Sequence, residues 1–155
     1  MPMPVPPTTI RELPDADRSA VLALSDRLTI GVAAWRDPVA VSAAVLGWLE
    51  TSTASDFAGA ALVAEIDGRV VGFVSVDVET HFAGEVDAYL GELLVDAPHE
   101  GAGVGAALVA AAESAARKRG HRCLTLSTGA ANHRALGFYS SLGFEAEDVK
   151  LTKVL

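Results

Sequence analysis

Residues 99–108, HEGAGVGAAL, place three glycines within five positions, directly before a run of small and apolar residues. Gly101, Gly103 and Gly105 leave a turn without side chains, so that backbone N–H groups can come close to a phosphate. A glycine turn that opens a helix occurs in a few folds, and these folds bind different phosphates. The elements on either side of this segment therefore decide which fold the chain adopts.

Apolar periodicity predicts elements in the order β α α β β β α β α β. This order favours an antiparallel meander followed by one βαβ crossover. The predicted strands cover residues 8–13, 61–66, 69–78, 88–95 and 122–127, with a final strand or short hairpin at 145–155. The predicted helices cover residues 19–28, 39–50, 103–119 and 132–142.

Several boundaries of these elements carry specific signals. Asp67-Gly68 joins two apolar strands with a residue pair favoured in two-residue hairpins. Asp37-Pro38 is typical of a helix N-terminus, because aspartate caps the first turn and proline fits its first position. Gly120 and Gly143 follow predicted helices where a left-handed residue often ends them. These signals agree with the predicted order of elements.

The chain of 155 residues is long enough for one domain with its own core. That domain is predicted over residues 8–155, after a disordered proline-rich lead-in at residues 1–7. No apolar run approaches the roughly 20 residues of a membrane-spanning helix, and the N-terminus does not resemble a signal peptide, so no membrane partner is expected. The single cysteine, Cys123, is predicted to lie in the core and fits a reducing, cytoplasmic location.

The net charge of −8 argues against a nucleic-acid partner. Residues 1–90 hold 5 Lys and Arg against 13 Asp and Glu, whereas residues 91–155 hold 7 of each. All of the acidic excess therefore lies in the front of the chain. A solvated acidic surface would explain it, and so would a cationic substrate that binds to the front half.

Two folds that use glycine turns are excluded by neighbouring residues. Gly101-x-Gly103-x-x-Ala106 fits the dinucleotide fingerprint, but that fold needs an acidic residue roughly 20 positions later to bind a ribose. The corresponding stretch, HRCLTLST at residues 121–128, contains no acidic residue. A nucleoside triphosphate loop needs Gly-Lys-Ser/Thr, whereas Gly105 is followed by two alanines. Another kind of pyrophosphate is therefore predicted.

A longer pattern extends through the second half of the chain. It combines Val95-x-x-Pro98-x-x-Gly101-x-Gly103-Val104-Gly105-x-x-Leu108, a helix ending Lys118-Arg119-Gly120, and Asn132-x-x-Ala135-x-x-Phe138-Tyr139-x-x-Leu142-Gly143-Phe144. This pattern resembles the GNAT superfamily of acyl-CoA N-acyltransferases. The resemblance is sharp over residues 90–144 and agrees in element order from residue 8 onward. It implies an α/β (α+β) fold with a mixed, mostly antiparallel sheet and helices on both faces.

The resemblance also implies an activity, the transfer of an acetyl group from acetyl-CoA to a primary amine. Asn132 and Tyr139 lie two turns apart on one predicted helix face. In the family, the equivalent asparagine contacts the pantetheine arm and the tyrosine protonates the departing thiolate; Asn132 also suits a helix N-cap. The glycine loop binds the pyrophosphate, the strand before it pairs with pantetheine, and the thioester lies in the gap between that strand and the next. The implied coenzyme contacts are Leu93, Leu94, Val95, Glu100, Gly101, Ala102, Gly103, Val104, Gly105, Asn132 and Tyr139.

Two positions depart from the family pattern. Glu100 stands where an arginine or glutamine usually begins the loop, and its carboxylate would repel two phosphates unless it points away. Gly91 stands where many members carry a catalytic base. Glu92 is the next candidate, provided that a β-bulge turns it to the same face. The other candidate bases are Asp87, Glu85, His81 and a water molecule.

Two functions remain open at this point. The first is an N-acetyltransferase in which the amine attacks directly within a ternary complex, with Tyr139 as general acid and Glu92 as base. The second is a non-catalytic module that senses acyl-CoA; Glu100 and Gly91 favour it, but a sensor has no need of Tyr139. The expected acceptor is a small-molecule or peptide amine, preferably cationic. No metal is expected. Members of the family often dimerise, so a homodimer is possible, and the sequence leaves the oligomeric state open.

Overall fold

The computed structural model describes residues 7–155; residues 1–6, most of the predicted lead-in, lie outside the described part. This part contains a five-stranded sheet with the order β1-β2-β3-β4-β5. Strands β1 to β4 pair antiparallel, whereas β5 pairs parallel with β4. The arrangement confirms the predicted mixed sheet with one crossover. The strands are β1 (Thr9–Glu12), β2 (Ala60–Ile66), β3 (Arg69–Thr80), β4 (Val86–Val95) and β5 (Leu124–Thr125).

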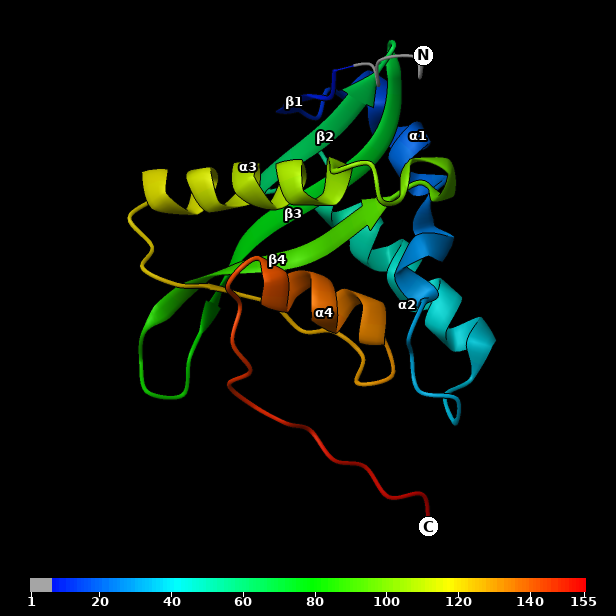
Figure 1. Ribbon diagram of the computed structural model, residues 1–155, viewed down its shortest axis with the longest axis vertical. Helices are drawn as coiled ribbons and strands as arrows, with labels where there is room; N and C mark the ends of the chain where they lie inside the picture. The colour runs from blue at the N-terminus through cyan, green and yellow to red at the C-terminus, as the bar shows by residue number, and fades with distance from the viewer. Residues whose placement is uncertain (1–6) are drawn as a thin grey trace.

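The helices connect these strands in the predicted order (Figure 1). The helix predicted at residues 19–28 is divided in two, and Ser25 and Asp26, whose side chains compete for backbone hydrogen bonds, follow the break. Within residues 7–155 no helix is both long and apolar enough to cross a membrane. The helical segments are η1 (Asp15–Asp17), α1 (Arg18–Leu22), η2 (Ser25–Thr29), α2 (Pro38–Ser52), η3 (Ala97–His99), α3 (Val104–Lys118) and α4 (His133–Ser141).

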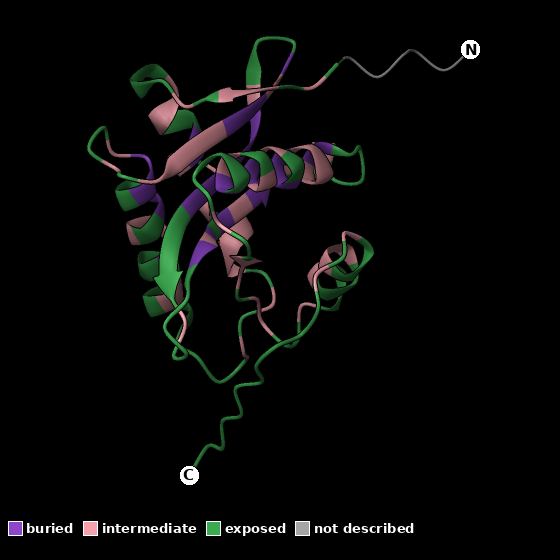
Figure 2. Ribbon diagram, turned by 90° about the vertical axis from the view of Figure 1, so that its left-hand side faces the viewer, coloured by how far each residue is buried: buried purple, intermediate pink, exposed green. Residues whose placement is uncertain are grey.

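Helices cover both faces of the sheet, as predicted. On one face α3 buries Val104, Leu108 and Ala112 against the central strands. On the other face α1 and α2 enclose a smaller cluster that includes Leu49 and Phe73. The buried residues in Figure 2 follow the sheet and the inner side of α3. Two apolar layers thus hold the sheet between them.

The boundary signals in the sequence correspond to observed turns and caps. Asp67 and Gly68 both have positive φ, 50° and 74°, as a two-residue hairpin turn of type I′ requires. The Asp37 carboxylate accepts a hydrogen bond from the Ala40 N–H at 3.1 Å and caps α2. Gly120 adopts φ of 83° just after α3. Local chemistry therefore sets these boundaries.

The prediction of a final strand or hairpin at residues 145–155 is wrong. This tail has no regular structure and extends away from the sheet (Figure 1). Val149 and Leu151 are 78% and 88% exposed. The edge strand β5 is only two residues long, so a further strand would find few backbone groups with which to pair.

The prediction that Cys123 lies in the core is also wrong, because its side chain is exposed. Cys123 directly precedes β5, the last strand of the sheet. Leu124 and Leu126 pack against the cluster beneath α3. Successive side chains of an extended segment point to opposite sides. Cys123, which directly precedes Leu124, therefore faces away from this cluster.

Candidate active site

Strands β4 and β5 run side by side over a short distance only. Their parallel pairing joins Ala88 with Leu124 and Tyr89 with Thr125. Beyond these pairs the chains separate, and a cavity of about 530 Å³ opens between β4 and residues 126–129. This cavity occupies the gap in which the sequence analysis placed the thioester.

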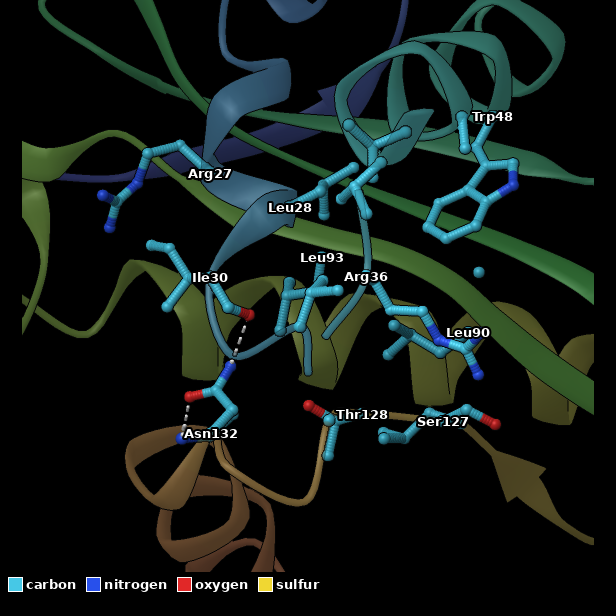
Figure 3. A pocket seen from close by; sticks show the side chains of 18 of the residues that line it. Arg27, Leu28, Ile30, Arg36, Trp48, Leu90, Leu93, Ser127, Thr128 and Asn132 are labelled. Carbon is cyan, nitrogen blue, oxygen red and sulfur yellow. Dashed lines mark hydrogen bonds between the residues drawn. The ribbon is translucent and has the colours of Figure 1, made fainter. Parts of the chain in front are cut away.

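The lining of the cavity is mostly apolar (Figure 3). Segment 27–32 and α2 contribute to it, and so do β4, the β5–α4 connection and α4. A cavity of this kind, apolar with a few polar groups, is typical of a site for a small ligand. Its larger apolar side chains are Leu28, Ile30, Val32, Val41, Val45, Trp48, Leu90, Leu93 and Leu126. Its polar and charged side chains are Arg27, Arg36, Asp37, Ser127, Thr128, Asn132 and Tyr139.

Tyr139 lies in the lining together with Asn132 and Ala135, so these three residues face the cavity from the same side. Leu136, which the sequence placed on the same helix face, is not among the lining residues and is 43% exposed. The Tyr139 ring packs edge-on against Phe144, with ring centroids 5.4 Å apart. Burial raises the pKa of Tyr139 to about 12, because the phenolate would lose its hydration. The hydroxyl therefore keeps its proton at neutral pH and can donate a hydrogen bond to a bound group.

Asn132 connects α4 to the loop that follows η2. Its Oδ1 accepts a hydrogen bond from the Ala135 N–H at 3.1 Å, which caps α4, and its Nδ2 donates to the Ile30 carbonyl at 3.4 Å (Figure 3). The loop after η2 and the connection between β5 and α4 are in close contact, since a Cβ on Gly129 would lie 2.1 Å from the Gly31 carbonyl oxygen. Both polar ends of the Asn132 amide are thus engaged within the protein.

A β-bulge interrupts β4 beside the cavity. The pairing of β3 with β4 shifts register between Val74 and Val76, so that Gly91 and Glu92 together oppose Ser75. A bulge at this place is the condition on which the orientation of Glu92 toward the thioester gap depends. Gly91 lines the cavity, whereas Glu92 is not among the lining residues.

Glu92 is buried, with 7% of its surface exposed. The Ser75 hydroxyl donates a hydrogen bond to its carboxylate, and the Glu92 N–H donates to the Ser75 oxygen at 3.1 Å. Burial raises the pKa of Glu92, against the lowering effect of the hydrogen bond from Ser75, and the negative charge of Asp77 raises it further. Glu92 therefore holds a proton more tightly than an ordinary glutamate.

The other candidate bases lie at the opposite end of β4. Asp87 and His81 line a separate small hollow, where His81 Nε2 is 3.1 Å from the Glu147 carboxylate. Glu85 pairs with Arg122 at 3.3 Å. None of the three candidates lines the cavity that contains Tyr139.

The glycine loop precedes α3, as predicted. Gly101 and Gly103 have φ of 75° and 87°, and a Cβ on either would meet no atom within 4 Å. The loop backbone is therefore accessible at the N-terminus of a 15-residue helix, whose dipole favours an anion. Gly105 has a different role, because a Cβ there would lie 3.2 Å from the Phe138 ring of α4.

Arg27 of η2 links this loop to β4 and the cavity. Its Nε donates to the Val95 carbonyl at 2.9 Å, and a second nitrogen forms an ion pair with Glu100. Glu100 also pairs with Arg134 of α4 at 2.7 Å. The Glu100 carboxylate is thus neutralised by two arginines.

Of the strand residues predicted to contact the coenzyme, Leu93 lines the cavity and Leu94 packs in the cluster around Phe73.

Three charged residues of the lining are not predicted from the sequence as site residues: Arg27, Arg36 and Asp37. Asp37 was predicted only as a helix cap. All three lie near the connection between the predicted helices, and connections of this kind often carry binding residues. Asp37 is also the one acidic side chain of residues 7–90 in the lining. The acidic front of the chain therefore lies mostly outside the cavity.

One family accounts for this fold and cavity. The acetyltransferase (GNAT) family matches residues 26–144, which include the glycine loop, the β-bulge and α4. The chain belongs to the GNAT family.

Two relatives share part of the sequence. An uncharacterized N-acetyltransferase of Methanocaldococcus jannaschii is 38% identical over 89 residues, which are 56% of this chain and 39% of that protein. An uncharacterized N-acetyltransferase of Archaeoglobus fulgidus is 38% identical over 86 residues, 52% of this chain and 56% of that protein. The matches therefore span about half or less of the length of these curated relatives.

Solved structures share the whole fold. A putative acetyltransferase from Pyrococcus furiosus superposes with a TM-score of 0.77 at 20% identity, over 96% of this chain and 100% of that chain. The aminoglycoside N-acetyltransferase AAC(6′)-Iy, in complex with coenzyme A, superposes with a TM-score of 0.74 at 21% identity, over 99% and 98% of the two chains. At such identities the comparison concerns the fold, and it confirms the predicted fold class.

Proposed function

We propose that this protein transfers an acetyl group from acetyl-CoA to the nitrogen of a primary amine. The observation that carries the proposal is the apolar cavity between β4 and β5, which has Tyr139 in its lining. Arg27 connects the same cavity to the glycine loop through its ion pair with Glu100. Membership of the GNAT family and the N-acetyltransferase names of the two relatives support this activity.

Two features of the described residues fit acetyl-CoA. The accessible backbone of the loop from Glu100 to Gly105 suits a pyrophosphate, because N–H groups and a helix N-terminus both favour anions. The apolar cavity suits the pantetheine arm, with Leu93 and Asn132 beside it and the backbone of Leu94 and Val95 continuing toward the loop. The complex of AAC(6′)-Iy with coenzyme A supports this class of ligand. When bound, acetyl-CoA supplies the activated thioester.

Tyr139 is the proposed general acid. As the amine nitrogen bonds to the thioester carbonyl carbon, the carbon–sulfur bond breaks and the sulfur gains negative charge. The Tyr139 hydroxyl donates a hydrogen bond to this sulfur and assists its protonation. Because burial raises the pKa of Tyr139 to about 12, above the roughly 8.5 of a free thiol, hydrogen bonding is the larger part of this assistance and solvent completes the proton transfer.

Glu92 is the proposed base, and it acts through a water molecule in the cavity beside Gly91. The acceptor arrives as a cationic ammonium ion, which must lose a proton before its nitrogen can attack. Burial raises the pKa of Glu92, which brings this carboxylate closer to the neutral range in which a base is most effective. The Ser75 hydroxyl holds the carboxylate in place.

We also propose that the protein forms a homodimer. The tail leaves Val149, Leu151 and Val154 exposed, and burial of these apolar side chains against a second chain would stabilise a dimer. Light scattering after size-exclusion chromatography should give the mass of two chains, and removal of residues 145–155 should give one. A monomeric full-length protein would contradict this part of the proposal.

Two measurements test the acetyltransferase activity. Acetyl-CoA at a hundredfold excess over Kd should stabilise the fold by about 2.7 kcal/mol, seen as a rise in Tm, whereas NAD and ATP should have much smaller effects. Release of free thiol from acetyl-CoA should depend on an added amine. A rise in Tm with NAD equal to that with acetyl-CoA, or no thiol release with any amine, would overturn the proposal.

A further inference from the structure

The two ends of the cavity each have an arginine, and the two arginines differ in whether they already have an ion-pair partner. Figure 3 shows Arg27 and Asn132 on one side and Trp48 and Ser127 on the other, with the Arg36 side chain extending toward that second side. Arg27 is bound to Glu100, which belongs to the glycine loop. If the loop holds the phosphates, the end with Trp48 and Arg36 remains for the acceptor.

Arg36 carries a charge that the protein does not neutralise directly. Among residues 7–155 its side chain forms no hydrogen bond and no ion pair. Its neighbour Asp37 uses its carboxylate to accept from the Ala40 N–H at 3.1 Å. Arg36 is exposed, and its guanidinium lies at the wall of a mostly apolar cavity without a partner among the described residues, so it is suited to bind a carboxylate.

The remaining surface at this end is apolar. Trp48 is 54% exposed although it lines the cavity, so a large aromatic face is available to a ligand. Val41 and Ala44 continue this surface along α2, and Leu90 faces it from β4. The surface matches an aliphatic or aromatic group rather than a polyhydroxylated or strongly charged one.

We propose that the acceptor is an α-amino acid with an apolar side chain, whose carboxylate binds Arg36 and whose side chain lies against Trp48. The inference deepens the proposed function and rests on it. An acceptor of this kind carries both charges, and the adjacent Asp37 carboxylate favours its ammonium group before the proton is lost. Arg36 thus determines which acceptor binds. It does so through the carboxylate, which only the α-carbon separates from the reacting nitrogen.

Direct binding tests the proposal without turnover. In a Trp35→Phe background Trp48 is the single tryptophan, so its fluorescence reports binding at this end of the cavity. With coenzyme A present, L-leucine should bind roughly tenfold to a hundredfold more tightly than L-leucinamide, which lacks the carboxylate. Arg36→Gln should remove this preference. Arg69→Gln, the same charge change in the exposed β2–β3 hairpin, should keep it.

Kinetics provide the second measurement. The ratio of KM for leucinamide to KM for leucine should show the same preference and the same loss in Arg36→Gln; kcat is not compared, because amidation also changes the basicity of the amine. Equal binding of leucine and leucinamide, binding of neither, or an Arg36→Gln effect that is the same for both would overturn the inference. Selective leucine binding without thiol release would instead overturn the proposed function, and Arg36 and Trp48 would then form an amino-acid binding site without acetyl transfer.

Discussion

The Glu100 carboxylate and the Arg134 guanidinium form an ion pair of 2.7 Å that joins the glycine loop to α4. The second oxygen of Glu100 pairs with Arg27, which also donates to the Val95 carbonyl. A residue that would repel phosphates on its own is therefore part of a group with two positive charges and one negative charge. The positive charges beside the glycine loop therefore come from η2 and α4, whereas the first position of the loop is the acidic Glu100.

We expect Glu100→Gln to tighten the binding of coenzyme A several-fold to roughly tenfold. The substitution removes the carboxylate that occupies both arginines, so that their donors become available to phosphate oxygens. Calorimetric titration measures the change, and the gain should shrink at high salt.

Glu113→Gln is the matched control, because Glu113 pairs with Arg117 on α3 away from the loop. The control should bind coenzyme A like the wild type. Weaker binding by Glu100→Gln would contradict the prediction and would mean that Glu100 orients the two arginines toward the ligand.

Tyr139→Phe should lower kcat by roughly 10²-fold or more, toward the lower part of the range for general acids. The substitution removes one hydroxyl and keeps the ring that packs against Phe138 and Phe144. The Kd for coenzyme A should stay close to that of the wild type. If kcat does not change, solvent alone protonates the departing thiolate.

The ionisation of Tyr139 can be observed directly, since the chain has two tyrosines. Burial raises the pKa of Tyr139 from 10.0 to about 12, so the folded protein holds this proton more tightly than the unfolded chain. Stability should therefore fall as pH rises between these two values. Absorbance titration of the wild type and of Tyr139→Phe gives the pKa by difference. A value near 10 for the folded protein would be inconsistent with the buried ring.

Short sequence patterns were sufficient to predict most of the helices, strands and turns of the fold. Asp67-Gly68 and Asp37-Pro38 specify a hairpin and a helix start through their own backbone preferences, and the glycine pattern specifies the loop before α3. The tail could not be predicted in this way. Its apolar residues resemble a strand, but a strand forms only where another strand offers an edge, and that condition depends on distant residues.

The cavity was predicted less completely for the same reason. The bulge at Gly91–Glu92 depends on how β4 pairs with β3, which no local pattern records. Arg27 and Glu100 are 73 residues apart, so their ion pair becomes visible only when η2 and the loop are brought together. The face shared by Asn132 and Tyr139 was predictable, because both residues lie on one helix.

Three glycines allow a prediction about stability. A Cβ on Gly47 or Gly137 would meet no atom within 4 Å, and both glycines lie inside helices. Gly47→Ala and Gly137→Ala should each raise the free energy of unfolding by about 0.5–1 kcal/mol, because alanine loses less backbone entropy in a helix. Gly129→Ala should lower it by about 1–3 kcal/mol, since its Cβ would overlap the Gly31 carbonyl oxygen. Urea denaturation of the three variants measures these changes.

Glu92→Gln should change stability and activity in opposite directions. Burial raises the pKa of Glu92, so the wild-type protein loses stability as pH rises from the ordinary pKa of a glutamate through the raised value. Glutamine keeps an oxygen that can accept from Ser75 and carries no charge to bury. Relative to the wild type, the variant should therefore become more stable in urea denaturation as pH rises above 4.5. If Glu92 is the base, kcat should fall by roughly 10²-fold or more over the same range, with unchanged affinity for coenzyme A. Unchanged kcat together with higher stability would leave Glu92 a structural residue and water as the base.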